Sequence, residues 1–362
     1  MAKLGEVCLL KAGKFVSAND ISPEYNKGLY PCFGGNGIRG YVADYTHDGE
    51  FPLIGRQGAL CGNVNLASGK FHATEHAVVV QPKIEMNVHW LYYALNAMNL
   101  GQYATGAAQP GLAVSKLETL SIEIPDTSEQ NKIAHNLYKV EQLVNFRKQQ
   151  LAKLDELVKA RFVEMFGGIN NSRLYPYSTI DSFTTVMSGG TPDRSISEYW
   201  AGGNIRWVKT TELQNRFISD TEEHITQLGL DNSSAKIIPA NAILIAMYGQ
   251  GKTRGMTAYL SSECATNQAC ACILPSTTVN QKFLWYYMIL SYDKLRDMAK
   301  GGNQPNLNIG LIKQFSVLIP PLSLQNQFAA FVERVDQQKQ TVQQSLEKLE
   351  LMKKALMQEY FG

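Results

Sequence analysis

The strongest constraint on the fold is a heptad pattern of apolar residues that occurs twice, from Ile133 to Met165 and, 195 residues later, from Phe328 to Tyr360. In both segments apolar side chains recur at alternating steps of four and three residues. A 3.5-residue repeat held for more than four heptads predicts a helix with the seam of a left-handed coiled coil. Basic residues occupy the positions where the apolar pattern is interrupted, namely Arg147, Arg161, Lys339 and Lys353.

Two long helices are therefore expected, at 128–165 and at about 323–360. The first has a start signal in Ser128 and Glu129 and a stop signal in Gly167-Gly168. At about 1.5 Å per residue each helix is on the order of 50–60 Å long. A solitary helix would expose its apolar seam to water, so the two helices are predicted to lie antiparallel, with globular parts at opposite ends.

The globular parts are also duplicated. Trp90 matches Trp285, and Gln109-Pro110 matches Gln304-Pro305, at the same spacing as the helices, whereas segments further upstream drift in register because the second half has gained residues. These observations predict a mixed α/β fold with a pseudo-two-fold internal duplication. Two β-rich α/β domains are joined by two long helices that form an antiparallel coiled coil. The expected divisions are 1–123 for the first domain, 124–168 for the first spacer helix, 169–319 for the second domain and 320–362 for the second spacer helix.

Composition excludes several classes of protein. The 362-residue chain is 44% apolar, which is ample for real cores and excludes global disorder. Its net charge of +2 means that any DNA contact must come from local loops and not from a globally basic surface. Without a long apolar run at the N-terminus or elsewhere, we expect a soluble, unexported, cytoplasmic chain without a membrane partner. Cys270-Ala-Cys272 lies in an apolar alternating run, which favours buried strand cysteines over a metal site.

Two glycine-rich motifs suggest nucleotide binding but lack its structural context. Residues 35–40 spell G-x-G-x-x-G, yet the residues that follow resemble a strand and not the helix that a dinucleotide fold requires. Residues 246–253 are one glycine short of a P-loop and also precede a strand-like segment. Neither a catalytic constellation nor metal-ligand spacing is present. A P-loop-like nucleotide-binding protein and a coiled-coil protein–protein scaffold without a DNA role remain as alternatives.

Polar side chains in the flexible loops remain as the candidate functional residues. Arg and Lys are suited to guanine, Asn and Gln to adenine, and all of these side chains also hold phosphates. Gln109 and Gln304, each preceding proline, suggest a common turn or a phosphate contact. The candidates are Asn36, Arg39, Arg56, Gln57, Asn63, Lys70 and Gln109 in the first half, and Lys209, Thr210, Gln250, Lys252, Thr253, Arg254, Asn267, Gln268 and Gln304 in the second.

The whole chain resembles the specificity subunit of a type I restriction–modification system. The resemblance rests on Tyr30-Pro31 with the glycine-rich run to Tyr41, on Gly189-Gly190-Thr191-Pro192, and on Ile205-Arg206-Trp207-Val208-Lys209-Thr210. It also rests on the Gln-Pro-x-Leu segments that lead to Ile-Pro and then to a long helix.

This resemblance implies two target-recognition domains, each binding one half of an asymmetric bipartite site in double-stranded DNA, with the paired helices as a spacer. It further implies docking of two methyltransferase subunits that carry S-adenosylmethionine, and of restriction/translocase subunits. ATP and Mg are then expected on the partner subunits, while this chain is expected to be non-catalytic and to hold no cofactor or metal of its own.

Overall fold

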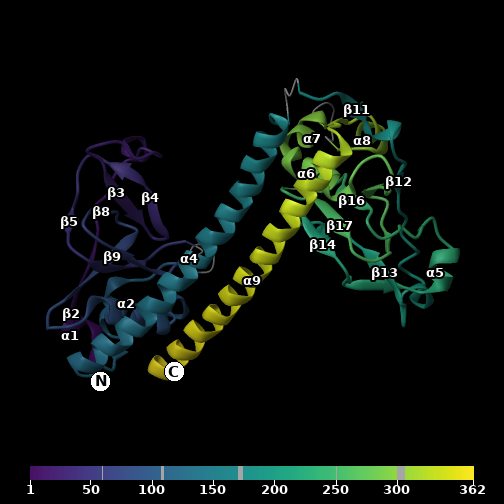
Figure 1. The fold of residues 1–362 in the computed structure, drawn as a ribbon. Coiled ribbons are helices and arrows are strands. Elements are labelled where there is room, and N and C mark those ends of the chain that lie inside the picture. Colours follow the sequence, from purple (N-terminus) through teal and green to yellow (C-terminus); the bar gives the residue numbers. More distant parts are fainter. Residues whose placement is uncertain (59, 107–109, 170–173, 250, 300–305) are drawn as a thin grey trace. The chain divides into compact units, whose positions relative to one another are not determined.

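The structure, a computed structural model, describes residues 1–58, 60–106, 110–169, 174–249, 251–299 and 306–362. It divides into two compact units. Unit 1 comprises Met1–Gln150 and Val342–Gly362, and unit 2 comprises Leu151–Thr341. The two longest helices, α4 (Thr127–Phe166) and α9 (Leu322–Phe361), each contribute to both units (Figure 1). The four-part division expected from the sequence stays a prediction.

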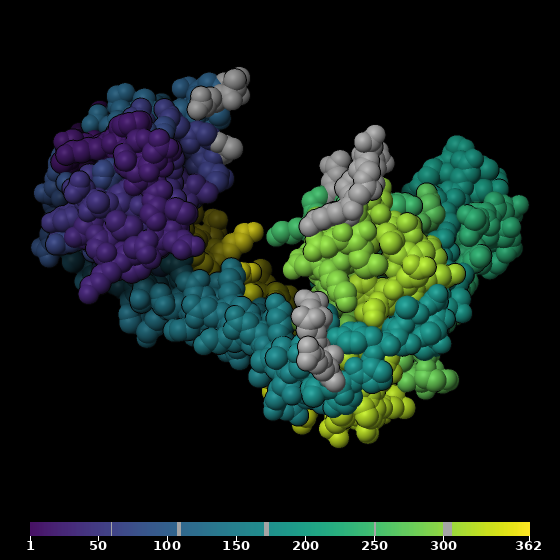
Figure 2. All heavy atoms as spheres, turned by 90° about the horizontal axis from the view of Figure 1, so that it is seen from above, coloured from purple at the N-terminus to yellow at the C-terminus, as the bar shows by residue number. Residues whose placement is uncertain are grey.

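Unit 1 contains two four-stranded sheets. The first is entirely antiparallel and has the order β2 (Cys8–Ala12), β9 (Ala77–Pro82), β6 (Phe51–Gly55) and β7 (Val64–Ala67). The second has the order β4 (Gly37–Val42), β3 (Tyr30–Gly34), β8 (Lys70–Ala73) and β5 (His47–Asp48), and its β3–β8 pair is parallel. In Figure 2 the N-terminal part of the chain, in purple, forms one continuous surface region of this unit.

The core of unit 1 lies on both faces of the first sheet. Val78 and Val80 on β9 belong to the cluster that includes Trp90 of α2 (Val88–Ala97), whereas Val79 belongs to a separate cluster with Phe71 of β8. Successive strand residues point to opposite faces, so β9 is covered on one side by α2 and on the other by the second sheet. The remaining elements are β1 (Ala2–Lys3), α1 (Leu4–Val7), η1 (Ala18–Asp20), η2 (Leu100–Tyr103), α3 (Val114–Glu118) and β10 (Ser121–Ile122).

Unit 2 repeats this plan, but its main sheet has five strands and its second sheet has three. Its main sheet has the order β12 (Val186–Ser188), β19 (Cys270–Ile273), β16 (Ile243–Ala246), β17 (Thr257–Leu260) and β14 (Arg216–Ile218). A second sheet has the order β15 (Glu223–Ile225), β13 (Ile205–Val208) and β18 (Ala265–Thr266), again with a parallel pair, β13–β18. The other elements are β11 (Tyr177–Thr179), η3 (Ile180–Ser182), η4 (Ser197–Tyr199), η5 (Thr210–Glu212), α5 (Gln227–Asp231), α8 (Ile309–Lys313) and β20 (Ser316–Leu318).

The domain helix of unit 2 is followed by a second helix: α6 (Gln281–Leu290) precedes α7 (Tyr292–Met298). The chain changes direction at Ser291, whose φ of −88° and ψ of 12° leave the α-helical region. Its backbone N–H closes the last turn of α6 by donating to the Tyr287 carbonyl oxygen at 3.0 Å.

Within each unit, α4 and α9 pack antiparallel. In unit 1 the Lys353 ammonium lies 2.6 Å from the Glu141 carboxylate, and Arg147 Nε donates to Ser345 Oγ at 3.1 Å. In unit 2 the ring centroids of Phe162 and Phe328 are 5.5 Å apart. Lys339 Nζ there lies 2.5 Å from a carboxylate oxygen of Asp155. In both units residue numbers on α9 fall as those on α4 rise, so the fold class predicted from the sequence is confirmed. Three of the four basic residues that interrupt the heptads, Arg147, Lys339 and Lys353, bond to the opposite helix.

The same amide clasp ties each long helix to its unit. In unit 1, Gln130 Oε1 accepts from the Asn87 backbone N–H at 2.8 Å, and Gln130 Nε2 donates to the Pro125 carbonyl oxygen at 2.9 Å. In unit 2, Gln325 makes the same two bonds, to Asn280 at 2.8 Å and to Pro320 at 2.7 Å. Both glutamines are buried, at 2% and 1% exposure. Because α2 and α6 begin directly after these asparagines, the clasp joins each domain helix to the first turn of a long helix.

Candidate nucleic-acid interface

The candidate site of unit 1 forms where three turns meet. These are the β3–β4 turn, the β6–β7 loop at 56–63 and the β8–β9 turn at 74–76. The Thr74 N–H donates to the Phe33 carbonyl oxygen at 2.9 Å, and the Arg56 N–H donates to the His76 carbonyl oxygen at 3.0 Å. These two bonds hold the turns together around a surface cavity of about 460 Å³.

Most of the candidates predicted in the first half converge on this cavity. Asn36, Arg39 and Gln57 line it. Asn63 lies beside them, because its Nδ2 donates to Asn36 Oδ1 at 3.1 Å. Arg56 is adjacent in the chain, and its Nε is buried without a hydrogen-bond partner among the described residues. Amides and guanidinium groups side by side are the donor and acceptor set that reads base edges and holds phosphates.

Lys70 lies away from this cavity, whereas one histidine that was not among the candidates lines it. Lys70 begins β8, three residues before Ala73, and Ala73 is the residue paired with Phe33 at the cavity end of β3. At about 3.3 Å per residue it lies roughly 10 Å away along the strand, with its ammonium 4.7 Å from the Tyr45 ring centroid. His76 does line the cavity. This role could not be predicted from the residues around His76, because His76 reaches the site only through strand pairing.

Unit 2 builds its candidate site on the same three junctions. The Asn267 N–H donates to the Val208 carbonyl oxygen at 3.4 Å, and the Met247 N–H donates to the Ala269 carbonyl oxygen at 2.8 Å. The end of β13, the three-residue β18–β19 turn and the β16–β17 loop therefore adjoin one another as their counterparts do in unit 1. Segments that carry the remaining candidates of the second half meet here: Lys209 and Thr210 after β13, Asn267 and Gln268 in the turn, and Lys252, Thr253 and Arg254 in the loop. Gln109, Gln250 and Gln304 lie outside the described residues.

Some of these side chains are already engaged within unit 2. The Lys209 ammonium lies 2.7 Å from the Glu222 carboxylate and 3.1 Å from that of Glu223, and its hydrogen bonds to these two carboxylates raise its pKa. Asn267 Oδ1 accepts from the Ala269 N–H at 3.1 Å, which stabilises the turn. Gln268 Oε1 accepts from Thr191 Oγ1 at 2.6 Å. The exposed Lys252 on the β16–β17 loop is therefore better placed to meet a phosphate than Lys209.

At each junction the backbone of one glycine lies very close to the end of a neighbouring strand. A Cβ on Gly189 would lie 1.9 Å from the Thr266 carbonyl oxygen at the end of β18, and a Cβ on Gly13 would lie 2.0 Å from the Ala73 carbonyl oxygen at the end of β8. Both contacts are far shorter than atoms allow, so only glycine fits. Gly189 is the first residue of the Gly189-Gly190-Thr191-Pro192 motif, which thus has a structural reason.

Neither glycine-rich motif has the geometry of a nucleotide site. Residues 35 and 36 form the turn of an antiparallel hairpin between β3 and β4, and residues 37–40 already belong to β4. The loop at 247–256 joins β16 to the antiparallel strand β17, and no helix follows it. A phosphate site of the P-loop type requires the N-terminus of a helix at this point. The strand predicted after each motif is confirmed, and the nucleotide-binding alternative is not favoured.

Cys270 and Cys272 are buried strand residues on β19, as predicted. Burial raises the pKa of the Cys270 thiol to about 12, which keeps it protonated and unsuited to metal binding. Among the residues that the structure describes, no cluster of potential metal ligands was found. Within the same residues, no helix is both long and apolar enough to cross a membrane.

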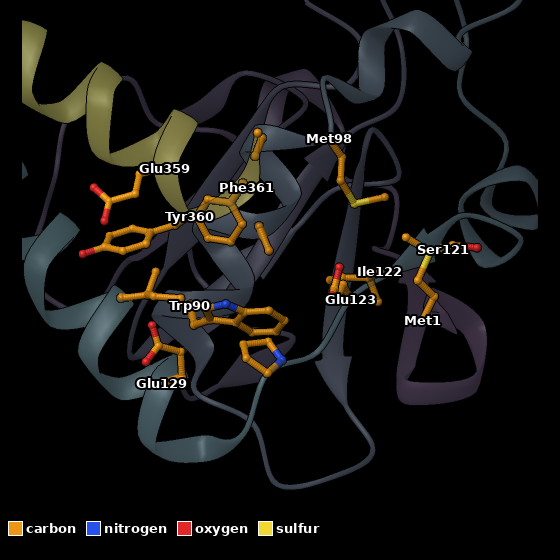
Figure 3. Close-up of a pocket in the computed structure, with 15 residues that line it drawn as sticks. Met1, Trp90, Met98, Ser121, Ile122, Glu123, Glu129, Glu359, Tyr360 and Phe361 are labelled. Carbon is orange, nitrogen blue, oxygen red and sulfur yellow. The ribbon is translucent and has the colours of Figure 1, made fainter.

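A second cavity of unit 1, of about 550 Å³, has a different character (Figure 3). It lies between α2, β10 and the ends of α4 and α9, with Trp90, Tyr360 and Phe361 in its wall. The carboxylates of Glu123, Glu129 and Glu359 also line it, and they would repel a phosphate backbone. None of the described candidate DNA contacts lines this cavity, so it is separate from the candidate interface.

Comparison with known proteins matches both halves of the chain. The family model for the type I restriction modification DNA specificity domain matches residues 1–156 and 175–351. The specificity subunit of the type I restriction enzyme EcoprrI from Escherichia coli is 52% identical over 143 residues, which are 39% of this chain and 36% of that protein. The chain thus matches little more than a third of that relative's length.

Solved structures share the fold. The S subunit of a type I restriction–modification system from M. genitalium matches with a TM-score of 0.66 and 16% identity, covering 99% of this chain and 95% of that chain. A structure concerning complex assembly and conformational transition of the type I R-M system matches with a TM-score of 0.57 and 14% identity, covering 99% and 96%. The family match extends over both units, and the chain therefore belongs to the type I restriction modification DNA specificity family.

Proposed function

We propose that this chain is the non-catalytic, sequence-reading subunit of a type I restriction–modification complex. Each unit contacts one half of a bipartite site in double-stranded DNA through its three-turn junction. The observation that carries this proposal is the occurrence of the same junction in both units of a chain whose family match covers both halves. The junctions are lined by amide, guanidinium and ammonium groups, which suit base edges and phosphates.

The two half-sites are proposed to differ in sequence. The junctions are built alike but carry different side chains at matching positions. The residue after Phe33 is Gly34, whereas the residue after Val208 is Lys209. In the turn, unit 1 has Glu75 and His76 where unit 2 has Gln268 and Ala269. Different donor and acceptor sets select different bases, so the target is asymmetric.

The two long helices are proposed to set the number of base pairs between the half-sites. Each helix has 40 residues, or about 60 Å at 1.5 Å per residue. Half-sites one DNA turn apart are about 34–36 Å centre to centre. The amide clasps support this role, because they fix the domain helix of each unit to the helix that would act as the spacer.

We further propose that the chain assembles in the cytoplasm with two methyltransferase subunits and with restriction/translocase subunits. The methyltransferase subunits bring S-adenosylmethionine, and the translocase brings ATP and Mg. A net charge of +2 supports a need for partners, since affinity for DNA rises with the number of phosphates that basic side chains neutralise.

The direct test is co-expression with the methyltransferase subunit of its type I system, followed by sequencing of methylated bases in the host genome. We expect one bipartite motif to become methylated only when this chain is present. Methylation that does not depend on the chain would overturn the proposal. It would favour the protein–protein scaffold alternative, as would the absence of a DNA footprint for the assembled complex.

A further inference from the structure

The β16–β17 loop of unit 2 is held by two residues that the sequence did not single out. Arg296 of α7 donates through NH1 to the carbonyl oxygens of Gly251 at 2.9 Å and of Arg254 at 3.0 Å. Tyr292, one turn earlier on α7, donates its hydroxyl to the Lys252 carbonyl oxygen at 2.7 Å. The backbone carbonyl groups of three loop residues therefore accept hydrogen bonds from one short helix, α7.

The two residues also support each other. Arg296 NH1 donates to the Tyr292 hydroxyl oxygen at 3.0 Å, and the guanidinium carbon lies 5.3 Å from the Tyr292 ring centroid. This one guanidinium nitrogen carries two N–H groups, which are shared among the two carbonyl oxygens and the Tyr292 hydroxyl oxygen. We call Arg296 and Tyr292 the loop clamp.

The loop needs such support because its backbone is unusual. Gly249, Gly251 and Gly255 have φ values of +136°, +61° and +87°. Glycines are free to leave these conformations, so the loop sequence alone does not fix one shape. The clamp bonds only to backbone carbonyl oxygens, so it orients the segment that carries Lys252, Thr253 and Arg254 without using their side chains as its acceptors.

Unit 1 supports the equivalent loop, β6–β7, with the equivalent segment of the chain, but through different contacts. The segment after α2 approaches the β6–β7 loop so closely that a Cβ on Gly62 would lie 2.2 Å from the Gly101 backbone nitrogen. Gly62 also has a φ of +88°, and its N–H donates to the Gly55 carbonyl oxygen at 2.7 Å. Both units therefore hold this loop with the segment that follows the domain helix, by backbone contact in unit 1 and by side chains in unit 2.

We propose that Arg296 and Tyr292 are positioning residues for sequence reading by unit 2. They hold the loop so that the side chains of Lys252, Thr253 and Arg254 meet the bases and phosphates of one half-site in a single geometry. This inference rests on the proposed function and adds the residues that determine how sharply one half of the target is read.

The test uses the full chain, co-expressed with its methyltransferase, and the methylated motif in genomic DNA as the readout. Exchange of residues 1–123 for the corresponding domain of another specificity subunit first assigns each half-site to its unit. In Arg296→Met the discrimination between correct and incorrect bases is expected to fall about tenfold to a hundredfold in the half-site of unit 2, as for the loss of a well-aligned base contact. The half-site of unit 1 should keep its discrimination and serves as the internal control.

Three further variants separate positioning from folding. Arg296→Lys keeps the charge but replaces the planar fork by a point donor, so it is expected to restore little discrimination. Tyr292→Phe removes only the hydroxyl and should give a smaller loss in the same half-site, which keeps the test valid if Arg296→Met does not fold. Arg334→Met removes an exposed arginine of α9 in the same unit and should change neither half-site.

Two outcomes would overturn the loop clamp as a positioning device. One is unchanged discrimination in the half-site of unit 2 with folded Arg296→Met or Tyr292→Phe. The other is an equal loss in both half-sites, which would indicate a general loss of stability. A wild-type complex that methylates no bipartite motif would instead contradict the proposed function, so the two failures are distinguishable.

Discussion

The amide clasp of unit 2 offers the sharpest test of how the domains are tied to the helices. Gln325→Met keeps the length and approximate volume of the side chain but removes one acceptor and one donor. The Asn280 N–H and the Pro320 carbonyl oxygen then lose their partners, which lie at 2.8 and 2.7 Å in the structure. Pro320 is buried, whereas Asn280 is half-buried.

The size of the effect follows from these two groups. A buried polar group that loses its partner costs about 1–3 kcal/mol. Water can partly replace the bond at the half-buried Asn280, so the expected loss in the free energy of unfolding is about 2–4 kcal/mol in total. With a slope of about 2 kcal/mol per molar urea, the unfolding midpoint of the affected unit should fall by about 1–2 M.

Urea unfolding followed by tryptophan fluorescence measures this change, since Trp200, Trp207 and Trp285 all belong to unit 2. Gln327→Met, at an exposed position two residues later on the same helix, is the matched control and should shift the midpoint by less than about 0.3 M, as surface substitutions usually do. A shift for Gln325→Met no larger than that of the control would refute the clasp as a stabilising connection.

Three other predictions concern single contacts. Thr257→Val removes the acceptor for the buried Trp285 indole N–H, which lies 2.9 Å away, and is expected to lower the free energy of unfolding by about 1–3 kcal/mol in the same urea assay. Gly189→Ala places a methyl group 1.9 Å from a backbone carbonyl oxygen, so it should yield mostly insoluble chain or a thermal midpoint several degrees lower; a wild-type midpoint would contradict the close approach. Glu223→Gln weakens the ion pairing of Lys209, and the assembled complex should bind non-specific DNA more tightly, with a salt dependence steeper by up to about one ion in a titration of affinity against salt.

The parts of the fold that can be predicted from sequence are those specified by a short-range repeat of apolar residues. The heptads at Ile133–Met165 and Phe328–Tyr360 specify helices because a period of 3.5 residues has no other common origin. The repeat of Gln130 at Gln325 was visible too, but its meaning was not. One partner of each glutamine lies more than forty residues away in sequence, at Asn87 for Gln130 and at Asn280 for Gln325.

The candidate site was only partly predictable, because residue type does not specify strand direction. Asn36 and Gln57 were chosen for their amide groups, and strand pairing then brought them into one cavity. Lys70 is a candidate because its ammonium suits a phosphate or guanine, but it lies at the other end of its strand. His76 was passed over because nothing near it in sequence suggests binding, and the register of β8 against β3 is set by pairings across some forty residues.

Independent reading of two half-sites by two units is the property on which the proposed function depends. The most direct measurement is the methylated motif in cells that carry the methyltransferase and a chain in which residues 1–123 have been replaced by the corresponding domain of another specificity subunit. We predict that one half of the motif changes, while the other half and the number of base pairs between the two halves stay the same. A motif that changes in both halves, or in neither, would contradict it.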